Sequence, residues 1–235
     1  QQLISAVAAP TAEGKLYEVD MRLRPSGNAG PIATSLAAFE QYQAGSAWTW
    51  EQMALTRARL VAGPEDLCAR AQAAIHATLI APRDAEKLKA DVLDMRARLA
   101  RGHPPASIWD VKYTDGGLID VEFLAQYLQL RHAQARPDVL DTNTCAALAR
   151  LNEAGFLAES DAKCLIRAGR LWRTIQGMLR FTYDGAFNEE TAPAGLRLAL
   201  TRATGAADFD ALKADMLATA NDVRAIFTRL VGNPV

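Results

Sequence analysis

Residues 160–179, SDAKCLIRAGRLWRTIQGML, decide the fold class, because their apolar side chains recur at the spacing of an α-helix. The members of this apolar stripe are Leu165, Ala168, Trp172, Ile175 and Leu179. Ser160 is suited to cap the start of the helix. Gly169 and Gly177 each cost about 1 kcal/mol relative to Ala inside a helix. They therefore predict that a neighbouring helix packs closely at both positions.

The same helical pattern extends in both directions from this segment. Toward the C-terminus, residues 208–231 space their apolar side chains like one face of a helical bundle. Gly155 and Phe156 form the sequence of a Schellman cap, which ends the preceding helix. Toward the N-terminus, further helices are predicted over about 35–44, 47–61, 64 onward, 84–100, 118–131 and 141–154. Helices of this length with short connections predict a helical bundle domain over residues 34–235.

The first 33 residues have a different pattern. Residues 1–9 predict the end of a helix that stops at Pro10, and residues 25–31 are a loop rich in Gly and Pro. Between them, residues 15–24 alternate as a strand. Its two predicted faces are Tyr17, Val19, Met21 and Leu23 on one side, and Glu18, Asp20, Arg22 and Arg24 on the other. The fold class is therefore mainly α, with two parts, 1–33 and 34–235.

The polar face of this strand indicates a meeting of a cation and an anionic group. A carboxylate such as Asp20 beside an arginine stays ionised at neutral pH and can ligate Mg²⁺. Arg22 and Arg24 could hold phosphate oxygens bidentately. Backbone N–H groups at Ser26 and Gly27 could approach the same anion. The alternative is a surface strand with cross-strand ion pairs, followed by an ordinary loop.

Composition excludes several classes of function. The chain has 26 basic and 27 acidic residues, with a net charge of −1, which argues against nucleic acid as a partner. No apolar run approaches the ~18 residues that a membrane span needs. The three cysteines are far apart, which predicts core thiols in a reducing cytoplasm and no zinc site. The start at Gln-Gln, without a leader pattern, is expected of a piece cut from a longer protein.

Three blocks of sequence resemble one family. They are YEVDMRLRPSG at 17–27, AFEQYQ…AWTWEQMALTRAR over 38–59 and DVKYTDGGLIDVEFLAQ at 110–126. In this order they resemble the glutamine synthetase adenylyltransferases, also called glutamate–ammonia-ligase adenylyltransferases. The family combines polymerase-beta-like nucleotidyltransferase domains with helical bundles, and the middle block is similar to its C-terminal, AMP-adding half. The resemblance implies that residues 1–33 are a truncated nucleotidyltransferase domain and include its last strand.

The resemblance assigns roles to the polar face described above. It implies that Asp20 is the third carboxylate of a Mg²⁺ site, and therefore both a catalytic and a metal-binding residue. Arg22, Arg24, Ser26 and Gly27 would bind the nucleotide of the substrate ATP. The family's D-x-D metal pair lies on an earlier strand and does not occur here. The chain alone is therefore expected to be inactive. The strand is expected to be poorly ordered, to borrow a short local partner, or to pair with another molecule.

The other two blocks have both functional and structural interpretations. Lys112, Asp120 and Glu122 could dock the bundle on the catalytic domain, and a related motif occurs in the uridylyltransferases of the PII signal protein. Alternatively, Asp120 and Glu122 simply offset the dipole at a helix start. In the middle block, Trp48 and Trp50 cannot share one helix face. Core packing with solvated arginines is the favoured interpretation there, and contact of Arg57 or Arg59 with a nucleotide is the alternative.

By resemblance, the parent enzyme transfers AMP from ATP to a tyrosine of glutamine synthetase, with Mg²⁺ as cofactor, and so regulates nitrogen assimilation in the cytoplasm. Glutamine synthetase and the PII protein are the implied partners. Two alternatives stay open. The chain could be a piece of a PII uridylyltransferase, or a helical module that binds glutamine synthetase or PII without catalysis.

Overall fold

The computed structural model of the chain describes residues 2–15, 19–183, 185 and 187–233. In these residues the fold is mainly α-helical, as predicted, and no helix is both long and apolar enough to cross a membrane. The helices are α1 Gln2–Ala8, α2 Leu36–Gly45, α3 Thr49–Leu55, α4 Glu65–Ile80, α5 Ala85–Gly102, α6 Leu118–His132, α7 Thr144–Glu153, α8 Glu159–Thr182, α9 Ala194–Thr204 and α10 Phe209–Leu230. Two-residue strands β1 Pro10–Thr11 and β2 Gly14–Lys15 form an antiparallel hairpin, and short 3₁₀ turns lie at Gly27–Ala29 and Pro137–Val139.

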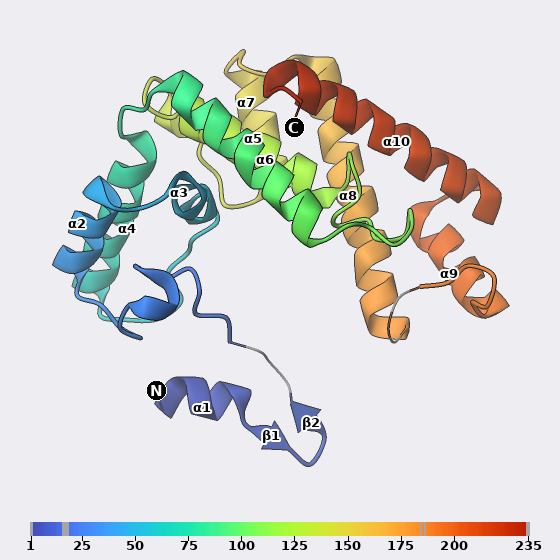
Figure 1. The fold of residues 1–235 in the computed structure, drawn as a ribbon, viewed down its shortest axis with the longest axis horizontal. Helices are drawn as coiled ribbons and strands as arrows, with labels where there is room; N and C mark the ends of the chain where they lie inside the picture. The colour runs from blue at the N-terminus through green and yellow to red at the C-terminus, as the bar shows by residue number, and fades with distance from the viewer. Residues whose placement is uncertain (1, 16–18, 184, 186, 234–235) are drawn as a thin grey trace.

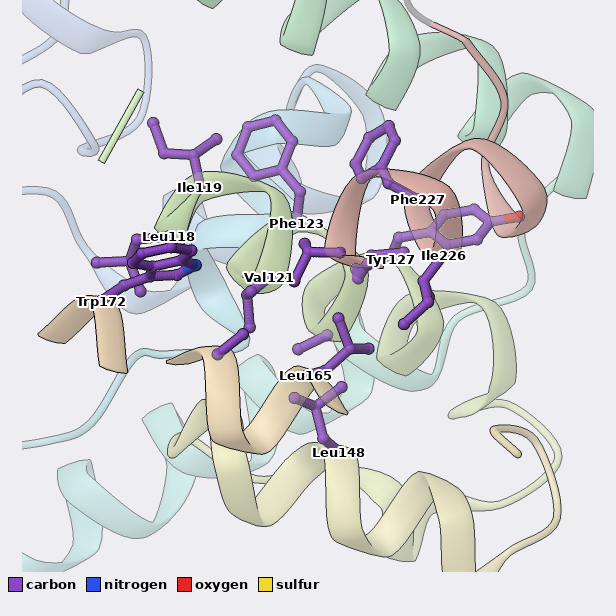
Figure 2. Close-up of a cluster of buried hydrophobic side chains, with 14 of the residues drawn as sticks. Leu118, Ile119, Val121, Phe123, Tyr127, Leu148, Leu165, Trp172, Ile226 and Phe227 are labelled. Carbon is purple, nitrogen blue, oxygen red and sulfur yellow. The ribbon is translucent and has the colours of Figure 1, made fainter. Parts of the chain in front are cut away.

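Helix α6 lies at the centre of the bundle. Every residue from Leu118 to Leu130 except Glu122 is buried, because α3, α5, α7, α8 and α10 all contact this helix. Figure 2 shows side chains of α6 among residues of α7, α8 and α10. Trp172 and Phe227 are 1% and 0% exposed. This confirms the apolar stripes that the sequence predicted for α8 and α10.

Most predicted helix ends are present. Ser35 caps α2 by accepting from the N–H of Ala38 at 3.2 Å, and Asp208 caps α10 by accepting from Ala211 at 2.7 Å. Gly155 has φ +79°, and the N–H of Phe156 donates to the carbonyl of Leu151 at 2.9 Å, which completes the predicted Schellman cap. The predicted cap of α8 is wrong: the N-cap is Ala158, so Ser160 lies inside the first turn.

The predicted strand over 15–24 is present only at its start. Lys15 belongs to β2 and pairs with Pro10, while residues 16–18 lie outside the described residues. Residues 19–21 have no regular secondary structure, and the chain turns over 22–26. The turn is closed by the N–H of Gly27, which donates to the carbonyl of Arg24 at 2.8 Å. Figure 1 shows α1 and the hairpin set apart from the other helices.

Two helices differ from the sequence prediction. Helix α3 ends at Leu55 rather than at about 61, because the N–H groups of the next three residues donate to carbonyls three positions back instead of four. Helix α9 was not predicted, although Pro193 precedes it and Gly205, with φ +74°, ends it.

The two glycines inside α8 behave differently. A Cβ at Gly169 would lie 3.5 Å from Val121 Cγ1 and 3.8 Å from Cys145 Sγ, so neighbouring helices do pack closely there. A Cβ at Gly177 would meet no heavy atom within 4 Å. The prediction of close packing is therefore confirmed for Gly169 and wrong for Gly177.

Candidate functional site: the Asp115–Glu122 loop and its pocket

A buried arginine organises the turn that precedes α6. Arg96 of α5 is 1% exposed, and its guanidinium donates from Nε to Asp120 and from Nη2 to Asp115 Oδ1 at 2.9 Å. The second oxygen of Asp120 accepts from the N–H of Gly116 at 2.6 Å. Asp120 itself is fully buried. Asp120 therefore holds this turn against α5, and a docking role for Asp120 stays a prediction.

The same turn is wedged between α8 and α10. Gly116 has φ +73°, and a Cβ at this position would lie 1.8 Å from the carbonyl oxygen of Ala220. The indole N–H of Trp172 donates to the carbonyl of Gly116 at 3.1 Å. Only glycine combines this backbone conformation with this close approach. The Gly-Gly pair therefore has a packing role in the bundle.

Glu122 is the one acidic side chain of this block that faces outward at the start of α6. Its Oε1 accepts from Arg57 at 2.9 Å and from Arg173 of α8 at 3.4 Å, and the side chain is 18% exposed. Arg173 also donates to the hydroxyl of Thr144 at 2.9 Å. Glu122 thus joins the end of α3 to α8, and Arg57 is paired rather than simply solvated. A docking role for Glu122 stays a prediction.

Lys112, the third residue proposed for docking, borders a pocket. This pocket of about 510 Å³ lies between residues 106–113 and the C-terminal part of α8. The ammonium of Lys112 lies 4.7 Å from the centre of the Tyr113 ring. That ring stacks on His103 with centroids 4.5 Å apart. Within the described part of the chain, the ammonium of Lys112 forms no ion pair and borders the pocket.

Asp20 and Arg22 form a local ion pair on the surface. The Nε of Arg22 lies 3.0 Å from both oxygens of Asp20, and its Nη2 lies 2.7 Å from Oδ2. The backbone N–H of Arg22 also donates to Oδ1 at 2.9 Å. These hydrogen bonds lower the pKa of Asp20 to about 2, so the carboxylate is ionised at neutral pH. They also raise the pKa of Arg22, to which the charge of Tyr113 adds a weaker effect.

The described residues do not by themselves form a magnesium site. Both oxygens of Asp20 are occupied by Arg22. Nowhere in the described ranges do three or more His, Cys, Asp or Glu side chains gather as ligands of one ion. Asp20 therefore supplies one ionised carboxylate with the chemistry that Mg²⁺ prefers, and no more.

The other residues predicted to bind nucleotide hold the loop itself. Arg24 donates from Nη1 to the carbonyl of Met21 at 2.7 Å and from Nε to that of Gly30 at 3.4 Å. Ser26 and Gly27 have φ of 60° and 51°, and Ser26 is the one non-glycine residue with positive φ in the described chain. Arg24 thus acts as an internal clamp here, and nucleotide binding by Arg24, Ser26 and Gly27 remains a prediction.

The two tryptophans of the middle block lie at the edge of a groove of about 640 Å³ between the start of α3 and α5. Trp48 is 69% exposed, whereas Trp50 is half-buried, so they do not share one environment. Behind them, Glu51 is 4% exposed and accepts from the Tyr42 hydroxyl at 2.9 Å and from the N–H of Trp48 at 2.8 Å. Arg59 is exposed.

Arg96 was missed by sequence reasoning, although a signal existed. It follows Val92 by four residues, on the apolar stripe that includes Leu88, Val92 and Leu99 of α5. A charged residue on the buried face of a helix requires a buried partner of opposite charge. Asp120 was the candidate, because its position one turn into α6 faces the same core.

The chain matches two family models, one described as an adenylyltransferase and the other as a uridylyltransferase. Residues 1–74 match the model described as glutamate-ammonia ligase adenylyltransferase, and residues 86–231 match the one described as GlnD PII-uridylyltransferase. The second match covers most of the bundle, including the Asp115–Glu122 loop. The class indicated by the helical fold and by these loops is therefore that of nucleotidyltransferases with a helical domain.

Curated relatives identify the family within this class. A bifunctional glutamine synthetase adenylyltransferase/adenylyl-removing enzyme of Rhodopseudomonas palustris is 47% identical over 99% of this chain and 23% of its own length. Enzymes of the same name from Bradyrhizobium diazoefficiens and Xanthobacter autotrophicus are each 45% identical over 98% of the chain and 23% of their own length. The chain belongs to the glutamine synthetase adenylyltransferase family. It spans about a quarter of the length of these relatives.

Proposed function

We propose that this chain is the C-terminal part of an enzyme that transfers AMP from ATP to a tyrosine of glutamine synthetase in the cytoplasm. The observation that carries the proposal is the 45–47% identity over 98–99% of the chain to enzymes named for this activity. Those enzymes are also named for adenylyl removal. The likeness of AWTWEQMALTRAR to the AMP-adding half supports addition of AMP as the reaction of this part. The PII protein is a second proposed partner.

In this proposal Asp20 is one carboxylate of a Mg²⁺ site, and the remaining ligands lie outside the described residues. Mg²⁺, when bound, would offset negative charge on the reacting phosphate. Arg22 lowers the pKa of Asp20 to about 2 by hydrogen bonding to the carboxylate, and it would have to turn away when the carboxylate takes up a cation. Turned away, its guanidinium is free to hold phosphate oxygens.

The experiment that tests the proposal replaces Asp20 by Asn in the longer enzyme that contains this chain. Transfer of labelled AMP from ATP to glutamine synthetase should fall by roughly 100-fold or more, because the substitution removes a charge that would bind the metal. Asp138→Asn is a matched control. Asp138 forms the same exposed pair with an arginine two residues away, with Nη2 of Arg136 2.7 Å from Oδ2. It should leave transfer unchanged.

Equal activity of Asp20→Asn and Asp138→Asn would overturn the role of Asp20. Because this chain supplies one of the expected carboxylates, we also expect that the chain by itself does not transfer AMP.

The match of residues 86–231 to the PII-uridylyltransferase model favours a second candidate, uridylyl transfer to the PII protein. The same longer enzyme, incubated with labelled UTP and PII, distinguishes the two. We expect no transfer of UMP, because the curated relatives that match nearly the whole chain carry the adenylyltransferase name. Transfer of UMP with no transfer of AMP would replace the first proposal by the second.

A further inference from the structure

The pocket beside Lys112 has the size and the lining of a small-molecule site. Its volume of about 510 Å³ lies within the range of ligand pockets. One side is formed by residues 106–113, and the other by side chains of α8, among them Gln176, Leu179 and Arg180. The pocket thus lies between the loop that leads into α6 and the helix that packs on α6.

The apolar wall of this pocket is rigid. Trp109 is 5% exposed and stacks on Phe209 with ring centroids 5.1 Å apart and 13° between the planes. Its indole N–H donates to Glu189 at 3.1 Å, and Glu189 also pairs with Lys213 at 2.8 Å. Trp109 therefore needs no ligand to fix its position.

Three charged side chains of the described residues line the pocket. Lys112 and Arg180 contribute positive charge, and Asp110 contributes one carboxylate. In the ranges that the structure describes, none of these three side chains is in an ion pair. Among the described lining residues there are thus two cations and one anion, and a half-buried ammonium gains most from a ligand that carries an anionic group.

We propose that this pocket binds a phosphate-bearing small molecule of the mononucleotide class. The phosphate lies at Lys112 and Arg180, the base lies against the wall of Trp109 and Leu179, and Asp110 accepts from a hydroxyl or amino group of the ligand. Adenine is chosen as the base because the inference rests on the proposed function.

The test is calorimetric titration of this 235-residue chain with AMP, pyrophosphate and adenosine, each without added metal. AMP should bind with a dissociation constant of roughly 0.1–1 mM, as expected of a few charge-assisted contacts. Lys112→Met and Arg180→Met should each weaken AMP binding by about tenfold, the loss of one charge-assisted hydrogen bond. Arg202→Met is the matched control, because Arg202 is an exposed arginine of α9 outside the pocket. This variant should bind AMP with the same dissociation constant as the unsubstituted chain.

Three outcomes would overturn the proposal. No binding of AMP at 5–10 times the expected dissociation constant would remove the site. Equal weakening by all three variants would show a nonspecific charge effect. Pyrophosphate binding as tightly as AMP, with no contribution from the base, would exclude the mononucleotide class. None of these results bears on AMP transfer by the longer enzyme, so this proposal can fail while the proposed function stands.

Discussion

At the scale of single residues, the charged side chains divide into two kinds. Asp120 and Arg96 are buried and satisfy each other inside the bundle, whereas Asp20 and Arg22 pair on the surface and depend on no core contact. The resemblance to the family identified both acidic residues as candidates but could not separate them. What separates them is desolvation, which depends on the helices that pack around each residue and not on its neighbours in the chain.

The buried pair predicts a large effect on stability. Asp120→Asn keeps the shape of the side chain but leaves the guanidinium of Arg96 without its main counter-charge in the core. The free energy of unfolding, measured by urea denaturation, should fall by about 3–5 kcal/mol. Asp94→Asn is the control, because Asp94 forms an exposed pair with Arg98 within the same helix. It should change stability by no more than ~0.5 kcal/mol. Similar denaturation midpoints for the two variants would mean that the buried pair of Arg96 and Asp120 does not stabilise the fold.

The surface pair predicts a measurable titration. Carbon NMR of the Asp20 carboxyl group should give a pKa of about 2, against the usual 3.8. Since the pKa is lowered in the folded chain, any stability from this pair is present above about pH 4 and is lost as the pH falls through about 2. Arg22→Gln should return the pKa toward 3.8, because the hydrogen bonds from Arg22 cause the shift. An unchanged pKa in that variant would mean that another group holds the carboxylate.

At the scale of helices and strands, the apolar periodicity of the sequence predicted which faces of the helices are buried. The stripes of α5, α8 and α10 and the caps at Ser35 and Asp208 were readable, because each depends on residues within one or two turns. The early end of α3 and the turn at 22–26 could not be predicted from the sequence in this way. Both depend on hydrogen bonds that compete with regular structure, such as those of Arg24 to two carbonyls of its own loop. Polar and apolar residues can alternate in the same way in a strand and in such a loop, so the sequence pattern alone does not distinguish the two.

The packing of α10 gives a prediction for a helix. Phe227→Ala should lower the free energy of unfolding by about 3–5 kcal/mol, because the side chain is 0% exposed and its removal leaves a cavity. Phe181→Ala in α8 removes the same group from a position that is 93% exposed. It should change stability by no more than ~0.5 kcal/mol. Thermal melts of the two variants provide the comparison. Coincident melts would show that Phe227 of α10 does not belong to the core.

At the scale of the whole molecule, the bundle should be independent of residues 1–33. Within the described residues, none of these 33 belongs to the hydrophobic core. A chain of residues 34–235, which retains the Ser35 cap, should therefore melt within ~3 °C of the full chain, because little apolar area is lost. A drop of 10 °C or more would mean that the N-terminal segment is part of one cooperative unit with the bundle.

The burial of α6 on nearly all sides also determines the order in which backbone amides exchange hydrogen with solvent. A backbone amide exchanges its hydrogen with solvent only when its hydrogen bond opens. The amides between Leu118 and Leu130 have neighbouring helices around them, so no partial opening at one edge of the bundle exposes them. They should exchange last, at the rate of global unfolding, while α1 and the ends of α2 exchange early. Helix α6 is thus the slowest part of the protein to open. The turn at its start should therefore keep its geometry until the whole fold unfolds.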